Sequence, residues 1–369
     1  MGAIQSVSAA AYQVRCWSEQ EWLGAAGEWN ELLATSTADP LFSSWDWQTL
    51  WWQHFGREVA DDLRIYAFYE AGRLIGLAPF YLSRQRRKGV LTCRSLQLIG
   101  SHWRDPHALI SEDLGLIAQR SHAASVYREC ARQLWARDDW NELVVACTRA
   151  APAWREAFDG LAGSERGYAR EVDATLSYQA DLASGFRAYL DSLGGSTRRA
   201  LWNLRPRLAA HGAVYAPSGA GHIEVAFAEL NRLHRQRWGS PVFEGRRLAF
   251  HLQLAQRLAA DGKLRLAQTR NGGRAIAVSY DIRIADRQYN MQLGFDAGID
   301  ARISPGLLHL GFAMEEAAQS GVAIYDFLAG GGQRTNYKAN LAQRTVTLGS
   351  LQFLRGSLLS TLYRWHDRA

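Results

Sequence analysis

The chain has 369 residues, of which 47% are hydrophobic and 21% are charged, as is typical of a soluble globular protein. Its formal net charge of +6 fits an anionic ligand such as a coenzyme or a tRNA, although an arginine-rich genome would give the same excess. The four scattered cysteines form no CxxC pair, which argues against a zinc site and a disulfide framework, so no metal is expected.

The length predicts two domains of about 150–200 residues each. The first residues lack the basic start and the long apolar run of a signal peptide. No stretch has the roughly 18 consecutive apolar residues that a membrane span requires. We therefore expect a cytoplasmic protein without a transmembrane segment.

Residues 11–150 predict a mixed α/β domain. Helical spacing runs from Ser18 to Leu33, and Ser44 is a predicted cap of a short aromatic helix. Strands are predicted over residues 63–70, 73–83, 95–100 and 142–148, and a helix over 118–136. Trp47 lies in the aromatic segment, whose side chains either fill the core or form the wall of a ligand cleft.

An irregular stretch over residues 151–185 connects the two domains and contains a predicted strand at 174–182. The later segment 197–208 is basic, and Pro206 argues against one straight helix across it. Its arginines form either a charged outer face or a strip that meets phosphates. These arginines are Arg198, Arg199, Arg205 and Arg207.

The second half alternates helices and strands. Amphipathic spacing predicts helices over residues 223–238 and 246–262. Runs of β-branched and aromatic residues predict strands over 263–270, 275–284, 288–295 and 322–328, the first three forming an antiparallel meander. A further helix is predicted to start after Ser304 and to end at Gly321.

The start of that helix has the sequence Ser304-Pro305-Gly306. Ser304 is a good N-cap, and Pro305 suits the first helical position because its missing N–H removes a donor that is unpaired there. Unpaired amides and a partial positive charge at a helix N-terminus suit a phosphate or pyrophosphate, and Arg302 adds a charge beside them. The alternative is an ordinary helix start without a ligand.

Several stretches resemble the CelD/Fem-like branch of the GNAT (Gcn-five-related) acyltransferase superfamily. The second half has the GNAT succession of two helices, three strands, a helix and a strand. Its specific markers are the SPGLL helix start, the YDFL strand and the pair Tyr337-Lys338. SSWDWQTLWWQHFG, RLIGLAPFYLS, SLQLIG and ELNRLHRQRWG also agree, so the resemblance covers about residues 15–350.

The resemblance implies an α/β fold with mixed sheets, built as two tandem GNAT-like domains. We place these at residues 1–165 and 166–369, with the active cleft mainly on the second. The sequence departs from the usual GNAT pyrophosphate signature, Q/R-x-x-G-x-G/A. With Arg302 at its first position, Pro305 and Leu307 stand where small residues are expected, which weakens acetyl-CoA binding in the usual mode.

The predicted donor site presents a charge, a hydroxyl and backbone amides to the donor phosphates. Its members are Arg302, Ser304, Gly306 and Leu307. Aromatic side chains are candidates for the substrate cleft, with core packing as the alternative for each of them. These candidates are Trp47, Trp238 and Tyr289.

Acyl transfer needs a held donor, a general base and stabilisation of the tetrahedral oxyanion. Asp326 is the predicted base or acceptor-binding group, and its alternative is a structural acceptor for nearby loop amides. Lys338 is predicted to pair with a phosphate or to neutralise the oxyanion, with Tyr337 as proton donor, as the resemblance to peptidoglycan-bridge ligases implies. The alternative for Lys338 is a surface lysine.

The leading hypothesis is an N- or O-acyltransferase that moves an acyl group, expected to be acetyl, from acyl-CoA to an amine or hydroxyl. The expected acceptor is a small molecule or a saccharide, in polysaccharide or cell-envelope biosynthesis. No G-x-S-x-G elbow indicates a covalent intermediate, so direct transfer in a ternary complex is expected. The alternatives are an aminoacyl-tRNA-dependent transferase on the same fold and a non-catalytic scaffold protein.

Overall fold

The computed structural model describes residues 12–87, 91–105, 109, 111–159, 161, 167–330 and 337–367. Contacts divide the chain into two compact units, one of Met1–Ala174 with Leu348–Ala369 and the other of Thr175–Thr347. The boundary predicted between residues 165 and 166 lies outside the described residues. The C-terminal residues from Leu348 onward, which we placed in the second domain, belong to the first unit.

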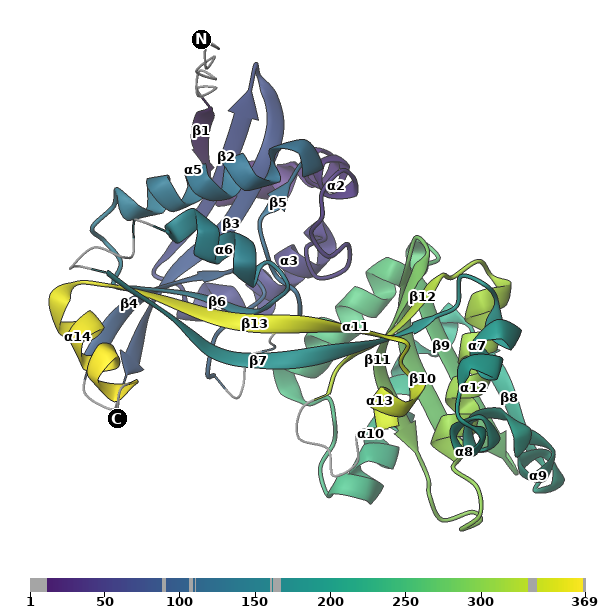
Figure 1. Ribbon diagram of the computed structural model, residues 1–369. Coiled ribbons are helices and arrows are strands. Elements are labelled where there is room, and N and C mark those ends of the chain that lie inside the picture. The colour runs from purple at the N-terminus through teal and green to yellow at the C-terminus, as the bar shows by residue number, and fades with distance from the viewer. Residues whose placement is uncertain are drawn as a thin grey trace, which may run out of the picture. The chain divides into compact units, whose positions relative to one another are not determined.

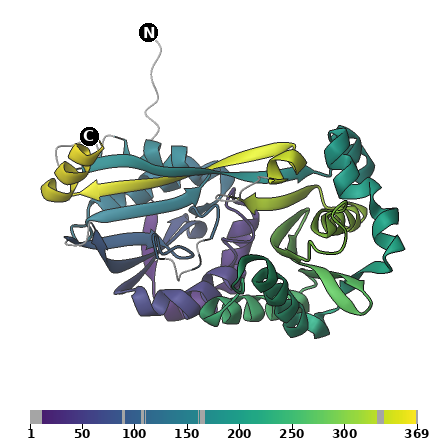
Figure 2. The same cartoon turned by 90° about the horizontal axis from the view of Figure 1, so that it is seen from below.

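The chain passes between the units inside two long strands, β7 (Gly167–Asp181) and β13 (Arg344–Arg355). In the first unit, β13 lies between β6 (Glu142–Thr148) and β7, and it pairs antiparallel with β6 (Figure 2). This pairing joins the C-terminal residues to the first unit. Strand pairing between segments so distant in sequence leaves no local signal, which is why the sequence did not predict it.

The first unit has a sheet with the strand order β1-β2-β3-β4-β6-β13. Its neighbouring strands are antiparallel except for β4 and β6. The other elements of this unit are β1 (Gln13–Trp17), α1 (Glu19–Gly24), α2 (Ala26–Ala34), α3 (Trp45–Trp51), η1 (Trp52–Gly56), α4 (Arg57–Val59), β2 (Asp62–Glu70), β3 (Arg73–Arg87), β4 (Leu91–Leu98), β5 (Ile117–Ala118), η2 (Arg120–His122), α5 (Ala123–Trp135), α6 (Ala151–Phe158) and α14 (Ser357–His366) (Figure 1).

Tryptophan side chains fill much of the core of the first unit. Trp22 and Trp29 are fully buried with ring centroids 6.0 Å apart. Trp47 is also buried, and its indole N–H donates to the Ser111 hydroxyl at 2.7 Å. Large aromatic rings bury much apolar area, and a buried indole N–H needs such a partner. The structure thus shows Trp47 in the core, the alternative that the sequence left open.

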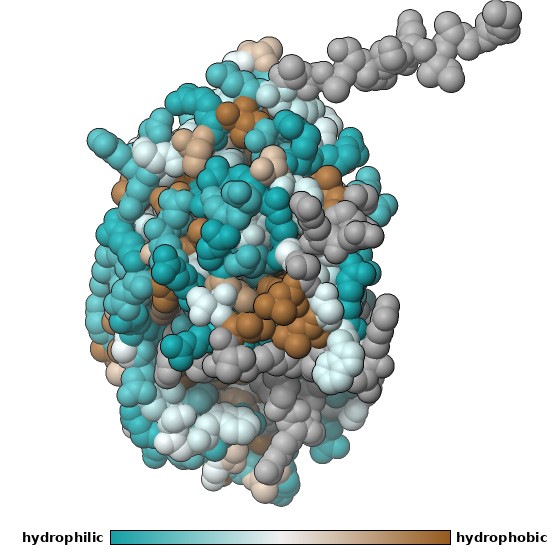
Figure 3. Space-filling model, turned by 90° about the vertical axis from the view of Figure 1, so that its left-hand side faces the viewer, coloured by the Kyte–Doolittle hydropathy of each residue, from teal (hydrophilic) through white to brown (hydrophobic). Residues whose placement is uncertain are grey.

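The C-terminal helix α14 has one packed face and one exposed face. Leu359 and Tyr363 are buried in a cluster with Cys93 of β4. Leu358 and Trp365 are 72% and 70% exposed. Figure 3 views the side on which α14 lies in Figure 1, and it shows a hydrophobic patch among mainly hydrophilic residues.

The second unit has the strand order β7-β12-β11-β10-β9-β8, with β11 and β12 as the parallel pair. Between β7 and β8 the chain forms four helical elements, which are α7 (Phe186–Ser192), α8 (Gly195–Arg198), η3 (Arg199–Asn203) and α9 (Arg205–Ala210). The remaining elements are β8 (Ala213–Ser218), η4 (Ala220–His222), α10 (Ile223–Trp238), α11 (Gly245–Ala260), β9 (Leu264–Asn271), β10 (Arg274–Ile284), β11 (Arg287–Phe295), α12 (Pro305–Gln319), β12 (Ile324–Ala329) and α13 (Tyr337–Leu341).

Helices cover both faces of this second sheet. On β10, Tyr280 packs against Phe227 of α10, with ring centroids 4.9 Å apart. The preceding Ser279 contacts His309 of α12, with 3.0 Å between the hydroxyl oxygen and Nε2. Adjacent residues of a strand point to opposite faces, so α10 and α12 lie on opposite sides of the sheet.

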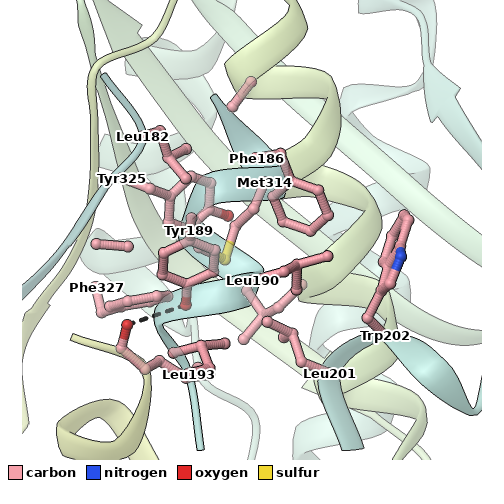
Figure 4. Packing of buried hydrophobic residues seen from close by; sticks show 14 of the residues in the cluster. Leu182, Phe186, Tyr189, Leu190, Leu193, Leu201, Trp202, Met314, Tyr325 and Phe327 are labelled. Carbon is pink, nitrogen blue, oxygen red and sulfur yellow. Dashed lines mark hydrogen bonds between the residues drawn. The ribbon is translucent and has the colours of Figure 1, made fainter. Parts of the chain in front are cut away.

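A hydrophobic cluster packs the short helices of residues 186–203 against α12 and β12 (Figure 4). Tyr189 donates its hydroxyl proton to the carbonyl of Leu341 at 2.9 Å, which fixes α13 to the same cluster. The labelled members of the cluster are Leu182, Phe186, Tyr189, Leu190, Leu193, Leu201, Trp202, Met314, Tyr325 and Phe327. This core therefore determines where α12 lies relative to the strand ends.

Local signals in the second half are confirmed where they mark helix ends. Pro206 stands in the first turn of α9 and separates it from η3, as predicted. Ser304 caps α12, its hydroxyl accepting from the amide of Leu307, and Gly321 follows the helix with a φ of +82°. The edge strand β8 was not predicted, because Pro217 inside it reads as a strand breaker. Among the described residues, none of the helices is long and apolar enough to cross a membrane.

Candidate functional site

The parallel strands β11 and β12 separate partway along their length. They pair from Arg287 opposite Ile324 to Tyr289 opposite Asp326, and no pairing between them follows in the described residues. On its other side, β11 has a bulge against β10, where the register shifts between Tyr280 and Asp281. A bulge bends a strand, so β11 turns away from β12 near Asn290.

A pocket of about 380 Å³ lies where β11 ends and α12 begins. Its residues come from the end of α10, the end of β11, the first turn of α12 and the start of α13. They are His234, Arg237, Trp238, Gln292, Leu293, Phe295, Ser304, Gly306, Leu307 and Tyr337. All of them belong to the second unit.

The pocket brings together five of the predicted site residues, namely Trp238, Ser304, Gly306, Leu307 and Tyr337. Trp238 is 55% exposed, so the core-packing alternative for this residue is wrong. The sequence reasoning missed the lining residues His234, Arg237, Gln292, Leu293 and Phe295. The sequence did hold one signal for this. His234 stands four residues before Trp238, and residues four apart on a helix share a face.

The charge in this pocket is positive, because Arg237 lines it and none of its described lining residues is a carboxylate. Arg237 places its guanidinium 4.3 Å from the ring centroid of Phe295 and 5.0 Å from that of Trp238. The Phe295 ring lies against Gly306, and a β-carbon there would stand 2.7 Å from its Cγ atom. Gly306 therefore lets the ring pack on the first turn of α12.

Tyr337 contributes a hydroxyl to the pocket. Burial raises the pKa of this hydroxyl, and the positive charge of Arg237 lowers it in part. A raised pKa keeps the phenol protonated at neutral pH, so Tyr337 can donate a proton but does not act as a base there. The role of proton donor stays a prediction.

Lys338 is 9% exposed, so the alternative of a surface lysine is wrong. Its ammonium donates to the carbonyls of Phe327, Leu328 and Ala329 at 2.6, 3.3 and 2.9 Å. An ammonium is a donor only, and these three contacts tie it to the backbone at the end of β12. Lys338 therefore holds the end of β12, and its role in catalysis stays a prediction.

Asp326 is buried on β12 and does not line the pocket. It accepts from Ser177, Gln179 and the amide of Leu328 at 3.2, 2.9 and 2.9 Å. Burial raises the pKa of this carboxyl, and the Leu328 amide and the charge of Arg287 lower it in part. The structural alternative anticipated loop amides, whereas the backbone amide that Asp326 accepts from belongs to Leu328 of β12, and a role as base stays a prediction.

The other candidates also lie away from the pocket lining. Arg302 has a 73% exposed side chain that pairs with Asp300 at 3.2 Å. Tyr289 is buried in the sheet, and Trp47 belongs to the first unit. For the two aromatic residues the structure shows the core packing that was their alternative.

Two of the four arginines in the basic segment 197–208 pair with acidic side chains. Arg198 pairs with Asp191 at 3.2 Å, and Arg207 pairs with Asp300 at 2.6 Å. These ion pairs reduce the positive charge that the segment offers to a nucleic acid. They favour the charged outer face over the strip that meets phosphates.

A second pocket of about 270 Å³ lies near the end of α12, with Asp281 in its wall. Tyr325, Gln288 and Asn290 donate to this buried carboxylate at 2.6, 2.8 and 2.7 Å. Burial nevertheless raises the pKa of Asp281 to about 6, above the value of about 3.9 for an unfolded aspartate. The folded chain therefore keeps a proton on Asp281 over a pH range where the unfolded chain has lost it.

This raised pKa predicts a loss of stability with rising pH. Because the folded state binds the extra proton, the contribution is present below pH 4 and lost between about pH 4 and 6, by about 3 kcal/mol. Urea unfolding of wild type and Asp281→Asn across this range measures it, with exposed Asp261→Asn as control. We expect the free energy of unfolding of Asp281→Asn to lack this decline, and parallel curves for wild type and Asp281→Asn would contradict the assignment.

Residues 195–339 match the family described as acetyltransferase (GNAT) domain. The likeness to this family thus covers the central part of the second unit. The matched segment contains the separation of β11 and β12, the start of α12 and every residue of the first pocket. Members of the family are acyltransferases that generally take acyl-CoA-type donors. No curated protein matches the sequence.

Solved structures share the fold of nearly the whole chain. The crystal structure of FemX superposes with a TM-score of 0.59 at 10% identity, covering 96% of this chain and 99% of that one. The C-terminal domain of an Agrobacterium fabrum protein assigned as a lysylphosphatidylglycerol synthetase gives a TM-score of 0.50 at 10% identity, covering 92% and 96%. At such identities the likeness shows the fold alone, and it confirms the predicted α/β class of tandem GNAT-like domains.

Proposed function

We propose that the chain moves an acyl group directly from an acyl-CoA donor to an amine or hydroxyl in the pocket at the start of α12. The observation that carries this is the position of the pocket. It opens where β11 leaves β12, and the capped end of α12, a guanidinium and a tyrosine hydroxyl line it. A positive pocket beside a helix N-terminus suits the phosphates of such a donor.

The donor phosphates have two sources of positive charge in reach of α12. Arg237 lines the pocket, and a guanidinium gives strong charge-assisted contacts to phosphate. Arg302 stands just before the helix cap but is paired with Asp300. Arg302 must leave this partner to reach a ligand, so we assign it a smaller part than the sequence suggested. Ser304, Gly306 and Leu307 complete the lining of the proposed donor site, where the Leu307 amide already donates to the Ser304 hydroxyl.

In the proposed transfer, the nucleophile of the acceptor attacks the acyl carbon and the carbon–sulfur bond of the donor breaks. Tyr337 gives its hydroxyl proton to the departing thiolate, since its raised pKa keeps it protonated until then. Lys338 and Asp326 have a structural part in this proposal, because their contacts hold the backbone at the end of β12 in place. The proposed acceptor is a saccharide or another small molecule, and the proposed process is cell-envelope biosynthesis.

Calorimetry with acetyl-CoA tests the donor. We expect micromolar binding by the wild type and about tenfold weaker binding by Arg237→Gln, since one charge-assisted contact is worth about 1.4 kcal/mol. Arg302→Ala is expected to weaken binding by about threefold or less. Arg235→Gln, an exposed change on the same helix, is the control. The absence of binding to acetyl-CoA and to longer acyl-CoAs would overturn the acyl-CoA assignment.

An aminoacyl-tRNA donor is the second candidate. The observation in its favour is the exposed ring of Trp238 beside Arg237, because nucleic acid ends bind by base stacking with phosphate contacts. Binding of charged tRNA that weakens steeply with salt, together with no binding of acyl-CoA, would select this candidate. A non-catalytic scaffold is the third candidate, and the pocket beside Ser304 weighs against it, although Lys338 does not line that pocket.

A further inference from the structure

Among its described lining residues, the pocket at the start of α12 has two side chains whose chemistry suits proton transfer. These are His234 and Tyr337, which carry the groups able to pass or take a proton in a transfer, because the described lining has no carboxylate and the Arg237 guanidinium does not lose its proton in proteins. The raised pKa of Tyr337 assigns it to proton donation. Among the residues that line this pocket, His234 is therefore the one side chain suited to accept a proton from the acceptor.

The tautomer of His234 is fixed by a backbone contact. Its Nδ1 atom lies 2.7 Å from the carbonyl oxygen of Ser240. A carbonyl only accepts hydrogen bonds, so Nδ1 must carry the proton and donate it. In the neutral ring, the Nε2 atom then has a free lone pair. This arrangement depends on Gly239, whose φ of +83° ends α10 and turns the chain back so that the Ser240 carbonyl reaches the ring.

Three buried histidines lack this arrangement. His309 is fully buried, with Nδ1 2.8 Å from Thr269 Oγ1 and Nε2 3.0 Å from Ser279 Oγ. His102 and His251 are also buried, and none of the three lines the pocket. His234 is half-buried on the last turns of α10 and faces the pocket. It thus combines access to a substrate with a fixed lone pair.

We propose that His234 is the general base of the transfer, which rests on the acyltransferase function proposed above. Its Nε2 takes the proton from the acceptor amine or hydroxyl while the acceptor lone pair forms the new bond to the acyl carbon. The carbon–sulfur bond breaks, and the thiolate takes the proton of Tyr337. The imidazolium then returns one proton to the tyrosinate through solvent, so both groups regain their starting state. The acceptor binds against the end of α10.

The ionisable groups that share the pocket with His234 come from two elements. Arg237 lies on its own helix, and Tyr337 comes from α13. The residues that β11 and α12 contribute carry no ionisable side chain, since they are Gln292, Leu293, Phe295, Ser304, Gly306 and Leu307. A pH effect at this site is therefore assigned by comparing His234, Arg237 and Tyr337 variants.

The first test needs neither donor nor acceptor. Nitrogen-15 NMR of histidine-labelled full-length protein, with His234→Gln to assign the signal, is expected to show the Nδ1–H tautomer. Diethyl pyrocarbonate, which reacts with unprotonated imidazole nitrogens, is expected to modify His234 well before the buried His309. A proton on Nε2 in the neutral ring, or a His234 as unreactive as His309, would overturn the proposal whatever the donor is.

The second test measures release of CoA from acetyl-CoA with water as the acceptor. We expect His234→Gln to lower kcat about 100-fold and to remove the limb along which the wild-type rate rises with pH. His222→Gln, an exposed change at the other end of α10, is the control and should leave rate and profile unchanged. An unchanged limb in His234→Gln would overturn the proposal. A wild type that neither binds nor cleaves acetyl-CoA would instead contradict the proposed donor, and the NMR and modification results would still decide on His234.

Discussion

Replacing Lys338 by Met is expected to lower the free energy of unfolding of the second unit by about 3 kcal/mol. The wild-type ammonium donates to three successive carbonyls of β12, and it is 9% exposed. A methionine fills a similar volume but donates nothing, so these acceptors lose their partner beside the opening of β11 and β12. A buried acceptor left without a partner costs about 1–3 kcal/mol.

Urea unfolding followed by hydrogen exchange of amides in the second unit measures this loss. Lys263→Met is the matched control, because the Lys263 side chain is 40% exposed and its ammonium pairs with Asp261. We expect that control to change stability by less than about 0.5 kcal/mol. A Lys338→Met protein as stable as wild type but without transfer activity would place Lys338 in the chemistry and contradict the structural role.

Substituting Gly311 with Ala is expected to destabilise the second unit by about 3 kcal/mol. Gly311 lies on α12 where the helix packs against η3, and a β-carbon there would overlap the carbonyl oxygen of Leu201. The same atom would stand 3.2 Å from the Trp202 ring. The obstacle is backbone inside a packed core, so it yields only by moving α12 or η3, and overpacking of this kind costs about 1–3 kcal/mol.

Thermal unfolding compares this variant with Gly27→Ala, a change in helix α2 where a β-carbon would meet nothing within 4 Å. The control is expected to be neutral or more stable by about 0.5–1 kcal/mol, because alanine favours the helix over glycine. If Gly311→Ala unfolds at the wild-type temperature, the close approach of α12 and η3 is not present in the protein. The variant is also expected to bind acetyl-CoA less well, because α12 positions Ser304 and Gly306.

The two units differ at the place where a GNAT-like sheet opens. In the first unit, β4 and β6 pair in parallel from Ser95 opposite Glu142 to Gln97 opposite Val144. Beyond them, the amide of Asp113 donates to the carbonyl of Cys147 at 2.6 Å, so a loop pairs with the end of β6. In the second unit the corresponding opening leads to a pocket. This difference supports placing the transfer in the second unit.

The end of α10 explains why the site was only partly predicted. The last turns of α10 carry His234, Arg237 and Trp238, and the sequence of this helix has an ordinary amphipathic pattern. Their partners in the pocket, including Phe295 and Tyr337, stand far along the chain. Helical spacing shows which residues share a face of α10 but not what that face meets.

The sequence by itself determined the features that depend on neighbouring residues. Ser304 caps α12 through the amide of Leu307, Pro206 interrupts the basic segment, and Gly321 ends α12 with a left-handed φ. Such features follow from backbone sterics and hydrogen bonds within a few residues, so the local sequence is enough to predict them. The motifs built on them were also enough to indicate the GNAT fold.

Only the tertiary structure decided which of these residues meet in the site. Lys338 and Asp326 look like catalytic groups in the sequence, yet the fold turns both toward the backbone of β12. Arg302 stands beside the helix cap but points to Asp300, while Arg237 occupies the pocket. Burial and hydrogen-bond partners depend on segments distant in the chain, and the pairing and packing of those segments is what local spacing does not encode.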